Sequence, residues 1–165
     1  MNYKVVINSA GRYYIRARAY STGSEDNGVH FGYNNNWPTS GSAAQWCGNW
    51  GKWKWSGNRR TEANHCGVYN ALYLDLPAGE HTIMVGMRED GFELDRFILT
   101  KDSKYFPSDA GPAESPRTTG GGSDDSSSGN DDQSAGFENT TLAEGMEFYT
   151  DRAYRLTSVP SFYEG

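Results

Sequence analysis

The stretch GRYYIRARAY, residues 11–20, decides the fold class of this chain. Small or apolar side chains alternate along it with larger polar or aromatic ones: Tyr13, Ile15, Ala17 and Ala19 against Tyr14, Arg16, Arg18 and Tyr20. Such period-two alternation is typical of a β-strand with one face buried. We therefore predict a strand over 12–20 whose arginines lie on a solvated outer face.

Six other segments have the length and composition of short strands: 3–8, 28–33, 52–55, 71–76, 81–87 and 93–100. The turn signal PAGE at 77–80 separates two apolar triplets of period two, which predicts an antiparallel hairpin between 71–76 and 81–87. No segment keeps a helical period over three turns. Short strands separated by turns predict an all-β antiparallel β-sandwich, a jelly roll.

Length and charge limit the function classes. The 165 residues are enough for one core-bearing domain and a tail. The net charge of −6 argues against a nucleic-acid partner. No stretch approaches about 18 consecutive apolar residues, so we expect a soluble chain without a membrane partner. The opening MNYKVVINSAG has no basic segment followed by an apolar one, so no secretory signal is visible in it.

The C-terminal third changes in composition. Residues 107–136 carry six acidic side chains against Arg117 alone, and GGGSDDSSSGNDDQSAG has almost nothing apolar to bury. We predict a module over 1–106 and a flexible, self-repelling linker over 107–136. Residues 137–165 contain two strand-like segments, 146–149 and 153–157. About thirty residues are too few for a core of their own, so they either start a next module or pack back to complete the sandwich.

All five tryptophans fall within loop-rich sequence: Trp37, Trp46, Trp50, Trp53 and Trp55. A core would spread its large aromatics along its strands, whereas clustering among Gly, Asn and Ser predicts a recognition surface. A pyranose ring offers an apolar face to flat aromatic rings and hydroxyls to polar side chains. We predict sugar binding, with Trp37 and Trp53 as exposed platforms and at least one tryptophan structural.

The candidate carbohydrate-binding residues combine these aromatics with nearby polar side chains: Trp37, Trp46, Trp53, Trp55, Asp26, Asn27, His30, Arg60, Glu62 and His65. Loop Asn and Asp residues more often form turns than contact ligands. His30 has an alternative role as a half-buried strand residue bonded to a neighbouring carbonyl. Arg16 and Arg18 become candidates if the ligand is an acidic polysaccharide.

Several segments together resemble a known family: GRYYIRARAYSTGSEDNGVHFG, WPTSG, QWC, KWKWS, RRTEANHCG, AGEHTIM and MREDGFELDRFILTKD. They resemble a repeated module of secreted marine polysaccharide-degrading proteins, related to the jelly-roll carbohydrate-binding modules of families 6 and 35. The likeness covers about 3–102, and FYTDRAYRLTSVP resembles an element near the start of other modules. It implies a galactose-binding-like sandwich, an extracellular location and sugar binding without catalysis.

The resemblance also implies a structural calcium ion. Related sandwiches build it from a last-strand acid, a first-strand acid and backbone carbonyls, and hard oxygen ligands suit calcium. Asp95 matches the last-strand position. Relatives begin with an Ala-Glu strand upstream of the first one here, and AEG at 143–145 makes Glu144 the displaced equivalent. The alternative is that the Asp95 region is solvated or paired with Arg88 and Arg96.

Cys47 and Cys66 are the two cysteines and flank the Trp-rich loop. An even count in a chain that resembles secreted modules predicts a disulfide that closes this loop. The rival is a zinc site formed with His30 and His65. It lacks a C-x-x-C pair, and its His65 and Cys66 are adjacent.

The predicted function is non-catalytic carbohydrate binding that targets a larger secreted protein to a polysaccharide, algal ones among the candidates. Its expected partners are that polysaccharide and attached catalytic or repeat domains. One alternative is a structural or adhesive spacer with buried tryptophans. Another is a glycoside hydrolase or polysaccharide lyase fragment. The acids sit in no motif that separates a glycosidase acid from its nucleophile, whereas the Tyr, His and Arg that a lyase needs are all present in the Trp-rich region.

Overall fold

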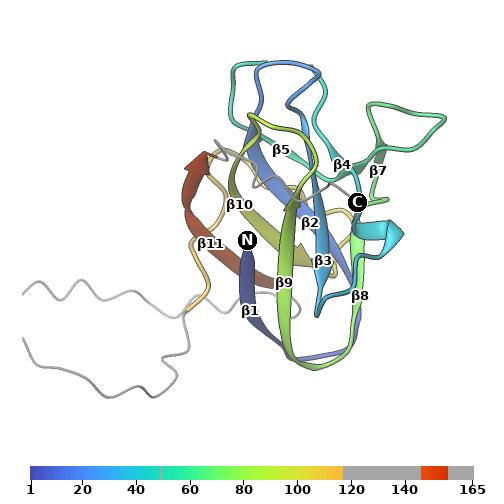
Figure 1. Cartoon of the computed structure of the whole chain (residues 1–165). Helices are drawn as coiled ribbons and strands as arrows, with labels where there is room; N and C mark the ends of the chain where they lie inside the picture. The colour runs from blue at the N-terminus through green and yellow to red at the C-terminus, as the bar shows by residue number, and fades with distance from the viewer. Residues whose placement is uncertain (49, 117–145, 156–165) are drawn as a thin grey trace, which may run out of the picture.

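The computed structural model describes residues 1–48 and 50–116 in full, and the backbone of 146–155. Two antiparallel sheets pack face to face as a β-sandwich, which confirms the predicted fold class (Figure 1). One sheet has six strands, in the order β1 (Asn2–Ile7), β9 (Gly79–Met87), β3 (Gly28–Tyr33), β4 (Ala44–Gln45), β6 (Asn58–Arg59) and β7 (Val68–Tyr69). A single 3-10 turn, η1 (Thr39–Gly41), follows β3.

The second sheet has five strands built around β2. Their order is β11 (Met146–Arg155), β10 (Glu93–Thr100), β2 (Gly11–Tyr20) and β5 (Lys54–Ser56), with β8 (Tyr73–Leu76) paired to the first half of β2. The described residues include no helix long and apolar enough to cross a bilayer.

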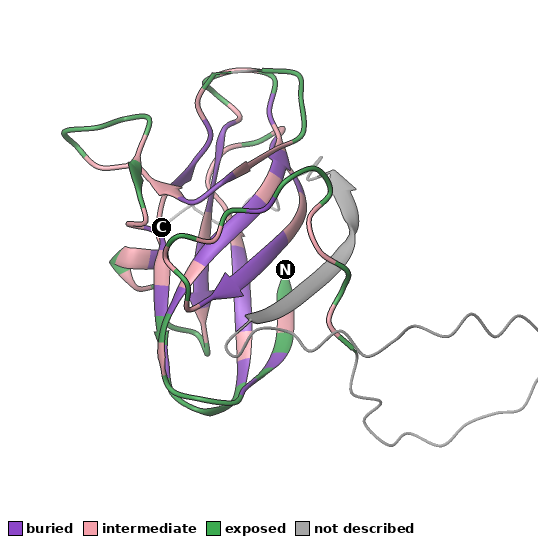
Figure 2. Ribbon diagram, turned by 180° about the vertical axis from the view of Figure 1, so that it is seen from behind, coloured by how far each residue is buried: buried purple, intermediate pink, exposed green. Residues whose placement is uncertain are grey.

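The alternation along β2 places its apolar face in the core. Tyr13, Ile15, Ala17 and Ala19 are at most 1% exposed and belong to one core cluster with buried residues of both sheets. Figure 2 shows buried segments on strands of both sheets. The predicted solvated face is wrong, however. Arg16 is fully buried, because residues beyond β10 cover the outer side of the sheet and give its guanidinium hydrogen-bond acceptors.

The predicted hairpin across PAGE is also wrong. β8 pairs with β2, whereas β9 lies between β1 and β3, so the turn connects one sheet to the other. Leu74 and Leu76 of β8 and Ile83 and Val85 of β9 are buried in one core. Two strands that face each other across a sandwich carry the same period-two pattern as two strands of a hairpin, so the pattern could not separate these arrangements.

The C-terminal strand lies at the edge of the second sheet. β11 runs antiparallel to β10, from Arg155 opposite Glu93 to Met146 opposite Thr100 (Figure 1). The chain also stays against the module beyond 106, because the Trp55 indole donates a hydrogen bond to the Asp109 carbonyl. Residues 117–145 and 156–165 lie outside the described part, so the division into module, linker and C-terminal piece stays a prediction.

Candidate functional site

A disulfide joins Cys47 to Cys66, as predicted, with their Cα atoms 5.4 Å apart. Because both sulfurs are bonded to each other, the alternative zinc site is wrong. The disulfide closes the segment between β4 and β7 into a loop. This segment contains β5 and β6, which belong to different sheets, so the bond restrains the crossing from one sheet to the other.

A hollow of about 570 Å³ lies against this disulfide, and we call it the aromatic hollow. Its lining mixes aromatic rings with amide, hydroxyl and ammonium groups: Gln45, Trp46, Cys47, Lys54, Trp55, Ser56, Asn58, Asn64, Cys66, Gly67, Tyr69 and Phe106. Among the described residues no carboxylate lines it. The hollow therefore offers apolar flat surfaces and neutral or cationic hydrogen-bonding groups.

Two exposed rings stand on the wall of the aromatic hollow. Tyr69 and Phe106 are each 46% exposed, with ring centroids 6.0 Å apart. Exposing so much aromatic surface costs hydrophobic free energy, which a ligand that stacks on the rings recovers. The Trp55 ring is half-buried and its indole N–H is taken by Asp109.

The buried Arg16 holds this wall in place. Its guanidinium lies 4.9 Å from the Tyr69 ring centroid and 6.0 Å from that of Phe106. It donates hydrogen bonds to the carbonyls of Tyr105 (2.9 Å) and Ser103 (3.0 Å), and to the Asn70 side chain. Burial lowers the Arg16 pKa, and nearby groups oppose the shift. One side chain of β2 thus fixes both segments that carry the exposed rings.

Polar side chains line the opposite side of the aromatic hollow. The Lys54 ammonium donates to the Cys47 carbonyl at 2.6 Å and also contacts the Gly48 carbonyl. Burial lowers the Lys54 pKa. Asn58 donates to the Cys66 carbonyl at 3.3 Å, and Asn64 accepts from the Cys66 N–H at 3.1 Å. The loop closed by the disulfide therefore presents two amide groups at fixed positions.

A second hollow of about 450 Å³ lies on the other side of the loop 60–67, and we call it the arginine hollow. Its lining is rich in positive charge: Ala43, Arg59, Arg60, Thr61, Glu62, His65 and Arg88. The two hollows share the loop as a wall, since Asn64 and Cys66 line the first and Thr61 and His65 line the second.

The predicted site residues divide between these hollows and other places. Trp46 and Trp55 line the aromatic hollow, whereas Arg60, Glu62 and His65 line the arginine hollow. Trp46 is nevertheless fully buried, edge-on to Phe92 at 4.8 Å between ring centroids. It meets the expectation of at least one structural tryptophan.

Trp37 and Trp53 are exposed, as expected, but they line neither hollow. Trp37 is 49% exposed and covers the glycines of two neighbouring strands. A Cβ atom at Gly32 or Gly86 would lie 2.8 Å or 2.9 Å from its indole. Trp53 is 36% exposed and packs against Tyr20, 5.6 Å between centroids. Their binding roles stay predictions.

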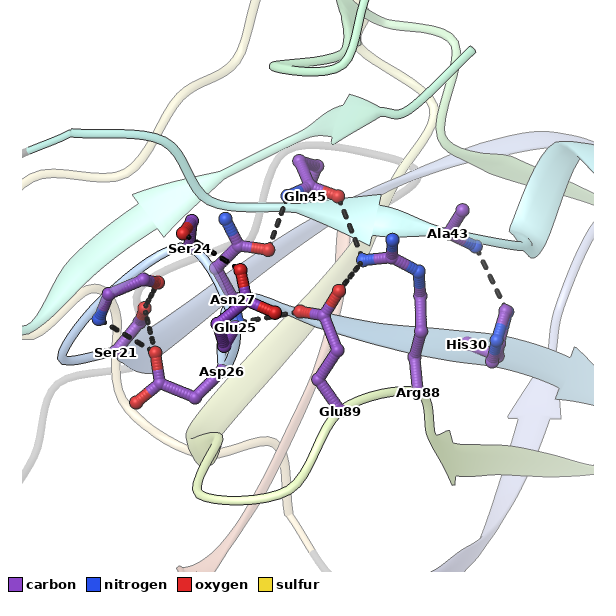
Figure 3. A network of polar contacts seen from close by, with 11 residues as sticks. Ser21, Ser24, Glu25, Asp26, Asn27, His30, Ala43, Gln45, Arg88 and Glu89 are labelled. Atoms are coloured by element: carbon purple, nitrogen blue, oxygen red, sulfur yellow. Dashed lines mark hydrogen bonds and ion pairs between the residues drawn. The ribbon is translucent and has the colours of Figure 1, made fainter. Parts of the chain in front are cut away.

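Asp26, Asn27 and His30 belong to a network that holds loops (Figure 3). Asn27 is 2% exposed, accepts from the Gln45 amide and donates its backbone N–H to Glu89 at 2.7 Å. Asp26 accepts hydrogen bonds from three nearby residues: Ser21, Thr22 and Gly23. Burial raises its pKa, but these hydrogen bonds outweigh burial and lower it overall. All three residues thus have defined structural partners.

His30 is bonded differently from the predicted alternative. Its Nδ1 accepts the Ala43 backbone N–H at 3.0 Å, where a carbonyl partner was expected. The neutral ring therefore carries its proton on Nε2. Burial lowers its pKa, and the positive charge of Arg88 lowers it further.

The surroundings of Asp95 do not favour a cation. Its carboxylate lies 2.6 Å from Arg18 Nη1 and 3.1 Å from Arg96 Nε. Glu144 lies outside the described residues. Within the described part, no group of three or more His, Cys, Asp or Glu side chains is arranged to hold a metal ion. Calcium binding therefore stays a prediction.

The sequence did not point to Tyr69, Phe106 or Asn58, which line the aromatic hollow beside the predicted Trp46 and Trp55. Tyr69 and Asn58 lie on two-residue strands, and Phe106 follows the last strand of the module. Such short segments show no periodicity. The available signal was the position of Tyr69 three residues after Cys66, close to the disulfide.

Fold and site together define a disulfide-tied, antiparallel β-sandwich with two adjoining hollows. The disulfide indicates an oxidising, extracytoplasmic compartment. A protein of Formosa agariphila, described as uncharacterized protein P23, is 53% identical over 113 residues. The match covers 68% of this chain but 27% of that relative's length. No protein-family profile matches the chain, and no solved structure is detectably similar.

Proposed function

We propose that this domain is a secreted, non-catalytic carbohydrate-binding module that binds a polysaccharide in the aromatic hollow. The observation that carries the proposal is the pair of exposed rings, Tyr69 and Phe106, beside fixed amides and the disulfide. The jelly-roll resemblance in the sequence points to the same class of protein.

The lining suits a sugar chemically. The apolar face of a pyranose would stack on Tyr69 or Phe106, and its hydroxyl groups would bond to Asn58, Asn64 and Lys54. A hollow of about 570 Å³ is within the usual range for a small ligand. Arg16 and the disulfide hold the two walls before the ligand arrives, which lowers the entropy cost of binding.

The module would serve a larger protein. Because the match covers 27% of the Formosa agariphila relative, such modules occur beside much additional sequence. Binding to an insoluble polysaccharide would hold an attached catalytic domain close to its substrate and raise the effective concentration.

The two alternative functions are less well supported. A glycosidase needs two carboxylates across one cleft, yet among the described residues the aromatic hollow has none and the arginine hollow has only Glu62. A structural spacer gives no reason to leave Tyr69 and Phe106 nearly half exposed.

A binding screen tests the proposal. We expect purified protein to bind one or more of agarose, carrageenan, alginate, xylan and pectin, as measured by retardation in affinity gels. Tyr69→Ala should weaken the binding about tenfold, the equivalent of one lost stacking contact. Val68→Ala is the matched control, since Val68 is 43% exposed on the same strand but outside the lining.

Three outcomes would contradict the proposal. If the folded protein retards on no polysaccharide, the domain is not a carbohydrate-binding module. If Tyr69→Ala and Val68→Ala bind equally well, the aromatic hollow is not the site. If reducing or unsaturated sugar ends are released, the domain is catalytic.

A further inference from the structure

The arginine hollow contains positive charge without matching negative charge. Arg12, Arg18, Arg88 and Arg96 each form an ion pair with a carboxylate. Arg59 and Arg60 form none with any residue that the structure describes. Glu62 is the one carboxylate on the described lining. In a chain of net charge −6, two adjacent guanidinium groups without an ion-pair partner indicate a site for an anionic ligand.

Backbone contacts hold these arginines in place. Arg60 donates its N–H to the Ala43 carbonyl at 2.8 Å, and the Arg59 Nε donates to the Thr39 carbonyl. That bond leaves the terminal nitrogens of Arg59 available. The loop that follows is closed by reciprocal backbone bonds between Thr61 and Asn64 at 3.0 and 3.2 Å, and by the disulfide. The backbone of the loop is therefore held in place before a ligand binds.

Arg88 is already committed to the protein. Its Nη1 lies 2.6 Å from Glu89 and 3.0 Å from the Gln45 side-chain oxygen. It therefore forms one wall of the hollow, while Arg59 and Arg60 supply the free donors. A guanidinium group matches the spacing of oxygens in a carboxylate or a sulfate and binds them through two parallel hydrogen bonds.

We infer that the polysaccharide bound by this domain is anionic, and that Arg59 and Arg60 bind its carboxylate or sulfate groups. This inference rests on the proposed function. A chain seated in the aromatic hollow needs only to cross the loop 60–67 to reach the arginine hollow. The positive charge is local to the arginine hollow in a chain of net charge −6, so the anionic groups would be bound by direct contact with these two arginines rather than by the field of the whole chain.

The test compares neutral and charged forms of one polymer backbone. Desulfated carrageenan is paired with sulfated carrageenan, and methyl-esterified pectin with de-esterified pectin, so that the arms separate sulfate from carboxylate. We expect the native protein to bind one charged form at least about tenfold more tightly than its neutral partner. The difference should shrink between about 0.01 M and 0.15 M ionic strength.

Variants locate the effect. Arg59→Gln/Arg60→Gln should abolish the preference for the charged form over its neutral partner. Lys4→Gln/Arg12→Gln removes the same charge from residues outside both hollows and should keep the preference. Arg60→Gln alone retains the bond from Arg59 to Thr39, so it should show a partial loss even if the double variant is unstable.

Failure of this inference can be distinguished from failure of the proposed function. If neutral and charged forms bind equally, and Tyr69→Ala weakens both, the module binds sugar but the anionic preference is wrong. If the preference persists in Arg59→Gln/Arg60→Gln, the arginine hollow is not its source. If no form binds, both proposals fail.

Discussion

At the scale of single residues, Arg16 links the core sheet to the proposed binding surface. A substitution Arg16→Met keeps most of the side-chain volume but leaves the Tyr105 carbonyl and the Asn70 side-chain oxygen without the Arg16 donor. The Ser103 carbonyl keeps its second donor, the Asn70 side-chain amide. We expect a loss of about 2–4 kcal/mol in the free energy of unfolding, because buried acceptors would be unsatisfied. Urea unfolding followed by tryptophan fluorescence measures it.

Arg12→Met is the control for Arg16. Arg12 and its partner Asp75 keep 46% and 60% of their side-chain surface exposed, and exposed ion pairs contribute about 0–1 kcal/mol. Equal stability of the two variants would show that the bonds made by Arg16 do not hold the outer segments.

His30 gives the fold a pH dependence. Burial and the nearby Arg88 depress its pKa in the folded state, while in the unfolded chain it titrates near the usual value of about 6.5. The unfolded state therefore takes up a proton first as the pH falls. The stability that neutral His30 contributes is complete above about pH 6.5 and is lost as the pH drops toward the folded pKa.

His30→Asn isolates this contribution, because Asn can accept the Ala43 N–H at the position of Nδ1. Free energies of unfolding of the native protein and of the variant are measured from pH 8 to pH 5. The other histidines are present in both proteins, so their contributions cancel in the difference. We expect the advantage of the native protein over the variant to decrease below about pH 6.5. A constant difference across this range would contradict the assignment.

At the scale of elements, the disulfide is the strongest local constraint on the loop between the hollows. Cys47→Ser/Cys66→Ser releases a closure over a sequence separation of 19 residues. In the chain-entropy model this costs about 3 kcal/mol of stability. Polysaccharide binding should weaken as well, since Asn58 and Asn64 lose their fixed partners. Native protein treated with reductant should behave like the variant; unchanged urea unfolding after reduction would contradict the prediction.

The strands show what the sequence could and could not predict. The bounds 28–33 and 93–100 were correct because both strands are long enough to show an alternation. β4, β6 and β7 were missed, since two residues have no period. For the same reason the Tyr69 ring of the aromatic hollow was not found. The sequence did not predict that β8 and β9 belong to different sheets. Alternation shows which side chains of a strand face the core, but it does not show in which of the two sheets the strand lies.

At the scale of the whole molecule, the pairing of β11 with β10 makes the C-terminal segment part of the sandwich. It covers the outer edge of β10, which otherwise lies beside β2 alone. Without β11, the eight residues Glu93–Thr100 would present unpaired backbone groups along one side. Exposed strand edges of this kind pair with other chains and promote association.

Two shortened chains test whether β11 belongs to the sandwich. A chain ending at residue 116 and one ending at 145 both lack β11, and they differ in residues 117–145, which comprise part of the predicted linker and the start of the predicted C-terminal piece. Both should unfold with a free energy lower by an amount on the order of 2 kcal/mol, because several ladder hydrogen bonds of about 1 kcal/mol each are lost. Both should also elute as larger species in light-scattering chromatography. If instead they match the full chain in stability and size, residues 146–155 do not complete this module, and the interpretation as the start of a next module gains the support.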